Sequence, residues 1–275
     1  MTRRKAERIR EGLMLCMLLA SCVEGERELE LREMSLAASE EPEFTAEGEG
    51  ADEVLERVQK DLHREPDEIL EIIATLLDSE DLRQRGLQLA TRIAVADGHL
   101  AAAHLTMLEE MADRLDLSHE FLEETLVNAQ RRSVRFAMVC LMYLTATADG
   151  RVRAEELEEM IPFALNLPTF RGIPSGEFRQ LAQTCCRNIA SIRESWGVDG
   201  LCGILNASAD MMQDDSIPTQ ALRMVARGIF ADGEVRDRER DFFHAIARKL
   251  RQADTLSETV MAAAARESRE QMRKL

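Results

Sequence analysis

One pattern recurs along this chain. An apolar run ends at a glycine, and a segment of mixed polar and apolar residues follows. Three of the runs close with the tripeptide Ala-Asp-Gly, at residues 96–98, 148–150 and 231–233. In each copy a branched aliphatic residue follows the glycine by two positions, and an amphipathic, helix-like segment comes next. Glycine favours the left-handed conformation that closes a helix at its C-terminus, and an internal repeat constrains the architecture strongly. We therefore predict helix–turn–helix hairpins closed at Gly98, Gly150 and Gly233.

A fourth, degenerate copy stands near the start of the chain as Val23-Glu24-Gly25. The run Leu13–Gly25 aligns without a gap with Met138–Gly150. The four copies pair into two larger units, so the pattern predicts a tandem duplication. We predict two domains, 1–132 and 133–275, each built from two hairpins.

Two local signals refine these boundaries. Residues 36–53 are rich in acidic residues and glycine, a composition that favours disorder, so we predict an acidic linker between the hairpins of the first domain. Ser79, Ser118, Ser175 and Thr255 each precede an amphipathic segment, and Glu258 completes a capping box with Thr255. Serine and threonine are favoured N-caps because the side-chain oxygen accepts a hydrogen bond from the first turn. We predict helix starts at all four residues.

The composition favours helices throughout. Hydrophobic residues make up 45% of the 275 residues, but aromatic residues only 4%. Leu, Ala, Met and Ile supply most of the apolar bulk, and Glu and Arg most of the charge, a mixture typical of helices rather than strands. The predicted fold class is all-α. The formal net charge of −16 repels phosphate backbones, which excludes nucleic acid as the main partner. It favours cations or a basic protein surface, although solubility alone also explains such a charge.

Six cysteines are scattered along the chain: Cys16, Cys22, Cys140, Cys185, Cys186 and Cys202. They form no CxxC pair, and no cysteine–histidine spacing suits a zinc site. Most lie in apolar stretches, where cysteine packs as a small hydrophobic residue. Reduced thiols in a cytoplasm fit this usage best. A reactive thiol cluster at Cys185, Cys186 and Cys202 is the alternative.

The N-terminal segment has two interpretations. Basic residues precede a short apolar run, Leu13–Ala20, and the sequence Leu19-Ala20-Ser21-Cys22 matches the cleavage pattern of bacterial lipoproteins. In that alternative Cys22 carries a lipid, and the protein sits on a membrane outside the cytoplasm. The run is at the short limit of a signal core, and its alignment with an internal segment favours a structural helix. We expect a cytoplasmic protein. No other run is long enough to cross a bilayer.

The repeated motifs resemble those of the TerB-like family, helical domains named after a tellurite-resistance protein. That family carries an apolar helix, then Ala-Asp-Gly-x-Val, then a helix with a glutamate, twice per domain. Two copies match this pattern here: 231–235 with Glu239, and 148–152 with Glu156. The resemblance implies tandem all-α domains without known catalytic activity. Such domains are linked to stress and resistance operons, and are proposed to bind metal ions or to act as membrane-proximal scaffolds.

The copy at Asp97 and Gly98 departs from the family pattern, because His104 stands where the other copies have glutamate. We therefore interpret Asp97 and Gly98 as structural residues of a turn. His99 and His104 could add ligands near Asp97, but histidines at the start of a helix are expected on the surface.

Acidic residues of the second domain are the candidate metal ligands. Their spacing matches the second half of an EF-hand loop, but Gly228 and Phe230 stand where that loop needs oxygen ligands. An EF-hand is therefore excluded. Two hairpins can still bring four carboxylates together: Asp149, Glu156, Asp232 and Glu239. Four close carboxylates repel one another unless a divalent cation such as calcium or zinc lies among them. In the alternative, each aspartate is a turn residue and each glutamate a helix-start charge.

No motif for catalysis stands out in the sequence. It holds no nucleophile with its base, no phosphate-binding loop and no dinucleotide fingerprint, and it indicates no small-molecule substrate. We predict a non-enzymatic interaction or scaffold protein of a bacterial stress or tellurite-resistance-type system, acting through protein partners. The alternatives are a divalent-metal sensor or buffer and a lipid-anchored envelope protein.

Overall fold

A computed structural model describes residues 3–23, 28–45, 50–146, 161–230 and 237–272. Within these ranges every regular element is a helix and no strand is present, which confirms the all-α prediction. No helix in the same ranges is both long enough and apolar enough to cross a membrane.

The chain divides into two compact units, Met1–Gln130 and Arg131–Leu275. The division falls inside one long helix, α8 (His119–Ala146). Residues Phe136–Thr145 of this helix are all buried. The prediction of a TerB-like fold for each unit is not tested by this division.

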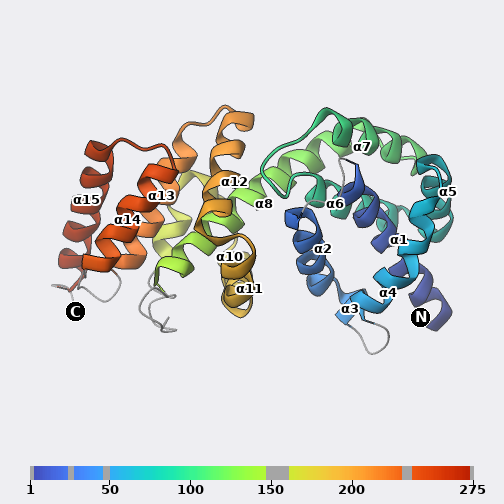
Figure 1. Ribbon diagram of the computed structural model, residues 1–275, viewed down its shortest axis with the longest axis horizontal. Helices are drawn as coiled ribbons and strands as arrows, with labels where there is room; N and C mark the ends of the chain where they lie inside the picture. Colours follow the sequence, from blue (N-terminus) through green and yellow to red (C-terminus); the bar gives the residue numbers. More distant parts are fainter. Residues whose placement is uncertain (1–2, 24–27, 46–49, 147–160, 231–236, 273–275) are drawn as a thin grey trace. The chain divides into compact units, whose positions relative to one another are not determined.

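The described residues of unit 1 form a short 3₁₀ helix and eight α-helices, the last of which is the first part of α8. Figure 1 shows their arrangement. In chain order the elements are α1 (Arg3–Cys22), α2 (Glu28–Glu40), α3 (Pro42–Thr45), α4 (Ala51–Val58), η1 (Gln59–His63), α5 (Pro66–Leu76), α6 (Glu80–Ala94) and α7 (Ala102–Arg114). The central one is α1, which packs against α2, α4, α5 and α6. Every residue from Leu13 to Ser21 is buried, so the apolar run of the N-terminal segment forms the core of this unit.

Helices α1 and α6 pack closely around Leu77, and two glycines allow this. A Cβ atom added at Gly12 of α1 would lie 2.7 Å from the Leu77 Cδ2 atom. One added at Gly86 of α6 would lie 2.8 Å from Leu77 Cδ1 and 2.9 Å from the Cys16 sulfur. Such distances are shorter than those of real Cβ contacts, so a side chain at either glycine would force Leu77 to move, and at Gly86 Cys16 as well.

In the range 36–53, predicted as an acidic linker, α2 continues to Glu40, α3 spans Pro42–Thr45 and α4 begins at Ala51, while Glu41 and Gly50 lie outside the helices. Several acidic side chains of this range have arginine partners on α6. Arg85 forms ion pairs with Glu41 and Glu43, and Arg92 with Glu40 at 2.6 Å.

The ion pair between α2 and α6 is deeply buried. Arg92 also pairs with Glu33, and the Arg92 side chain is 11% exposed. Burial by itself would lower the pKa of Arg92, but the charges of Glu33 and Glu40 outweigh it and raise the pKa. Arg92 thus remains a cation inside the unit and holds α2 on α6.

Unit 2 begins with the rest of α8, and residues 161–165 are helical. The following elements are η2 (Pro168–Phe170), α10 (Ser175–Arg187), α11 (Ile189–Ser195), α12 (Gly197–Met212), α13 (Ser216–Ile229), α14 (Asp237–Lys249) and α15 (Asp254–Met272). Helix α13 contacts α12, α14 and α15, and nearly all of its residues are buried. The core of unit 2 therefore lies around α13 and the apolar part of α8.

Candidate functional site

The motif copy at residues 96–98 forms a tight turn between α6 and α7. The Oδ1 atom of Asp97 accepts a hydrogen bond from the backbone N–H of His99 at 2.9 Å. Gly98 has a φ of +85°, and its N–H donates to the carbonyl oxygen of Val95 at 3.0 Å. A positive φ is readily adopted only by glycine. At this copy Asp97 and Gly98 are therefore residues of a turn. The preceding helix α6 ends at Ala94, so Gly98 lies in the turn and does not directly follow the last helical residue.

Of the four carboxylates predicted as metal ligands, the structure describes Glu239. It lies in the first turn of α14 and is half-buried. Asp149, Glu156 and Asp232 lie outside the described residues, as do Gly150 and Gly233. Among the residues that are described, no group of three or more His, Cys, Asp or Glu side chains is arranged to hold a metal ion. The four-carboxylate site therefore stays a prediction.

In unit 1, helix α2 follows the motif copy at 23–25 and helix α7 follows the copy at 96–98, and side chains of these two helices meet. His104 on α7 lies six positions after Gly98, where the other copies have Glu156 and Glu239. Its Nε2 atom is 3.6 Å from Oε1 of Glu30 on α2, and both side chains are 2% exposed. The same nitrogen lies 3.2 Å from the carbonyl oxygen of Ala20 at the end of α1.

The expectation that His104 lies on the surface was wrong. A histidine at the start of a helix carries no local sign of burial, and its partner Glu30 comes from the other half of the unit. His99 is exposed, as expected. Glu30 was not predicted as a functional residue. The sequence signal that could have identified Glu30 is its position five residues after Gly25. In the other copies a carboxylate or an imidazole stands six residues after the glycine.

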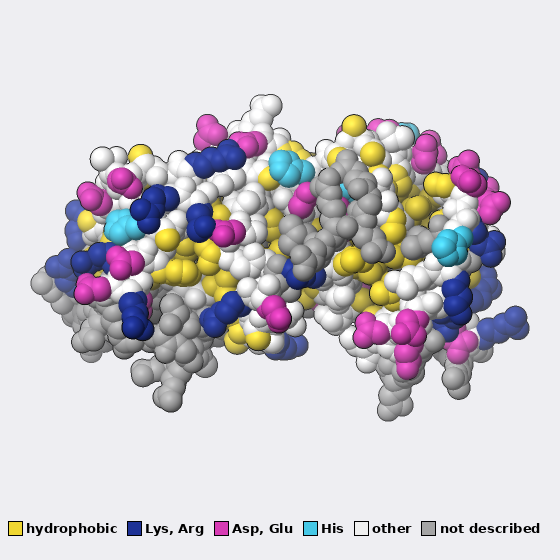
Figure 2. Space-filling model, in the orientation of Figure 1, with side chains coloured by type: hydrophobic (Ala, Val, Ile, Leu, Met, Phe, Trp, Pro, Cys, Tyr) yellow, Lys and Arg dark blue, Asp and Glu magenta, His cyan; other side chains and the backbone are white. Residues whose placement is uncertain are grey.

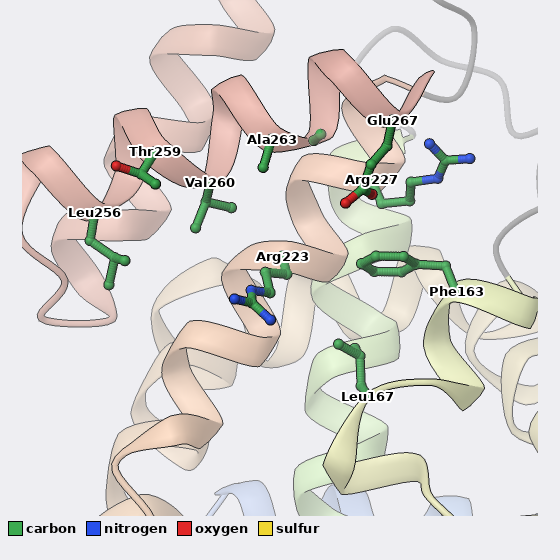
Figure 3. A pocket seen from close by; sticks show the side chains of 10 residues that line it. Phe163, Leu167, Arg223, Arg227, Leu256, Thr259, Val260, Ala263 and Glu267 are labelled. Atoms are coloured by element: carbon green, nitrogen blue, oxygen red, sulfur yellow. The ribbon is translucent and has the colours of Figure 1, made fainter. Parts of the chain in front are cut away.

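A half-open cavity of about 240 Å³ lies in unit 2 between α13, α15 and the helix end near Phe163 (Figure 3). Arg223 and Arg227 project from α13 toward it, and Glu267 lies on the α15 side. The rest of its lining is mainly apolar. Glu239, the one carboxylate of the predicted metal site that the structure describes, does not line this cavity.

Charged side chains of both signs are interspersed on the visible face of each unit, as Figure 2 shows.

The chain matches no protein-family model, no curated protein and no solved structure at a significant level. The resemblance to the TerB-like family therefore rests on the motif residues alone.

Proposed function

We propose that this protein is a non-enzymatic, TerB-like interaction protein of a bacterial stress or tellurite-resistance-type system. It acts by binding protein partners, and unit 2 holds a divalent cation, calcium or zinc, among Asp149, Glu156, Asp232 and Glu239. The observation that carries the metal site is the contact between Glu30 and His104 in unit 1.

The first support is the equivalence of the two units. Leu13–Gly25 aligns without a gap with Met138–Gly150, and the apolar parts of both runs are buried helices. In that alignment Thr145 takes the place of Ala20, whose carbonyl oxygen faces His104. Equivalent central helices are expected to place the helices that follow the motifs in equivalent positions.

The second support comes from charge. In unit 1 a carboxylate meets an imidazole, and an imidazole tolerates that neighbour whether it is neutral or protonated. In unit 2 the residues six positions after the glycines are both glutamates, Glu156 and Glu239. Two carboxylates held as close as Glu30 and His104 repel strongly at low solvent exposure. A divalent cation with oxygen ligands removes that repulsion.

Thermal unfolding with and without metal tests the cation site. We expect calcium or zinc to raise the melting temperature of the full chain, because a ligand that binds only the folded state stabilises it. The double variant Asp149→Ala, Asp232→Ala should lose the shift. Asp97→Ala is the matched control, since it removes the corresponding aspartate of unit 1, and it should keep the shift. The absence of a shift with every divalent metal tested would refute the site.

Partner binding is tested separately by affinity capture from the source cells with the purified full chain as bait. We expect one or more proteins to be retained specifically and, if the cation supports the binding surface, to be lost when a chelator is added. If the same proteins are retained with the chelator present, partner binding does not depend on the metal site. Failure to retain any protein would contradict the interaction role.

A further inference from the structure

Two buried thiols face each other in unit 2. The sulfur of Cys140 on α8 lies 3.2 Å from the sulfur of Cys185 on α10, and both residues are 0% exposed. A disulfide bond is about 2.05 Å long, so the sulfurs need to approach by only about 1 Å to form one. The two residues are far apart in the sequence, and their contact is made by the fold.

Helix α10 packs against the core through a narrow stripe of buried side chains. Its buried residues are Phe178, Ala182 and Cys185, which follow one another at helical spacing, while most of the others are exposed. Cys185 lies in the last turn, since the helix ends at Arg187. Helix ends held by few apolar contacts open locally at low free-energy cost. Such opening gives a small reagent access to the sulfur of Cys185.

The other cysteines have different settings. Cys16 and Cys202 are buried, and burial raises the pKa of both thiols, that of Cys202 to about 12. Cys186 is exposed. Burial raises the pKa of Tyr143, and the nearby thiols of Cys186, Cys185 and Cys140 raise it further. Cys186 therefore lies near Tyr143, as Cys140 and Cys185 do. It is the cysteine that would compete with Cys185 for a disulfide bond to Cys140.

We propose that Cys140 and Cys185 are an oxidation site at which a hydroperoxide forms an intramolecular disulfide between α8 and α10. In the first step one thiol attacks the hydroperoxide: the O–O bond breaks, an S–O bond forms, and an alcohol, or water from hydrogen peroxide, leaves. In the second step the other thiol attacks the sulfenic sulfur, the S–S bond forms and water leaves. The two thiols lose two electrons in total, and the hydroperoxide accepts them.

The bond has a mechanical consequence for unit 2. It closes the chain between residues 140 and 185, and a cross-link of this kind stabilises the folded state by restricting the unfolded chain. In the reduced protein the end of α10 can leave α8. In the oxidised protein it cannot, so an oxidant fixes one helix of the unit without changing the rest of the fold.

The test uses the full chain, treated with hydrogen peroxide while folded and then alkylated in denaturant. We expect two of the six thiols to escape alkylation and a cross-link between the tryptic peptides 136–151 and 180–187. Since Cys185 and Cys186 share the second peptide, the Cys186→Ser variant assigns the bond, and it must form the same cross-link. The melting temperature of the oxidised protein should exceed that of the reduced protein, and a thiol reductant should reverse the change.

Three results would overturn the proposal: six alkylatable thiols after oxidation, loss of the cross-link in Cys186→Ser, or a bond between other cysteines. Cys202→Ser is the matched control and should oxidise like the unaltered chain. Cys140→Ala and Cys185→Ala should each abolish the cross-link. If either fails to fold, the peptide assignment in Cys186→Ser decides the question alone.

Discussion

The imidazole of His104 and the carboxylate of Glu30 meet inside unit 1, with Nε2 3.6 Å from Oε1. The two residues lie in helices that follow different motif copies, so their contact joins the two halves of the unit. His104 stands six positions after Gly98, where unit 2 has a glutamate in both copies, whereas Glu30 stands five positions after Gly25.

Replacing His104 by glutamate gives unit 1 the carboxylate that the other copies carry. We expect His104→Glu to lower the free energy of unfolding by about 3–5 kcal/mol, because it leaves a buried carboxylate against Glu30 without compensation. Calcium or zinc should recover part of this loss if the pair of positions binds a cation. Urea unfolding with and without each metal measures both effects.

The matched control for this experiment is His104→Gln. It keeps a hydrogen-bonding side chain of similar length without adding charge, so we expect a smaller loss and no response to metal. An equal loss in both variants, with no recovery by any cation, would show that the position is sensitive to shape rather than to charge.

The glycine at the crossing of α1 and α6 is a second point of sensitivity. In Gly86→Ala the new Cβ meets Leu77 and Cys16 at less than 3.0 Å, and overpacking of this kind costs about 1–3 kcal/mol. Gly203→Ala is the matched substitution in α12, because nothing lies within 4 Å of the added Cβ. There alanine should stabilise the helix by up to about 1 kcal/mol. Urea denaturation of both variants should give shifts of opposite sign, and a stabilised Gly86→Ala would contradict the close packing.

The sequence predicted what depends on near neighbours. Ser79 and Ser118 begin helices as expected: the Ser79 Oγ accepts from the Leu82 N–H at 3.4 Å, and the Ser118 Oγ from the Phe121 N–H at 3.1 Å. The other two predicted residues already lie in their helices and are not N-caps: Pro174, not Ser175, is the N-cap of α10, and α15 begins at Asp254, one residue before Thr255. The turn at Asp97 is equally local, since its hydrogen bond goes to His99. Such features need only a few consecutive residues, and composition suffices for the all-α class.

What the sequence missed depends on distant partners. Arg85 and Arg92 of α6 form ion pairs with Glu40, Glu41 and Glu43, and the acidic composition of the range 36–53 alone gave no sign of these partners. The burial of His104 needs Glu30. A periodic pattern tells which face of a helix is apolar, but not which helix covers it.

Alkaline pH should destabilise the protein. Burial raises the pKa of Cys202 from 9.0 to about 12 and also raises that of Cys16. Between pH 9 and 12 the folded chain therefore holds protons that the unfolded chain has lost. The free energy of unfolding falls as the pH rises through this window, by about 1.4 kcal/mol per pH unit for each such proton. Urea unfolding at several pH values measures the slope.

The slope can be assigned with two variants. Cys202→Ala removes one of the buried thiols and should reduce the alkaline loss of stability. Cys186→Ala removes an exposed thiol and serves as the matched control, with the slope of the unaltered chain. A slope that is identical in all three proteins would mean that the buried thiol at Cys202 does not drive the effect.

The burial of α1 makes the lipoprotein alternative testable. Cleavage before Cys22 would remove Leu13–Ser21, all of which are buried in the core of unit 1. We expect a chain that starts at Cys22 to lose helical signal in circular dichroism, together with the cooperative unfolding of unit 1, because its core helix is missing. Cys22→Ser keeps α1 and removes only the lipid acceptor, so it should fold like the unaltered chain. A shortened chain that unfolds at the same temperature as the full chain, or a lipid on Cys22 found by mass measurement of protein from its source cells, would instead favour the envelope location.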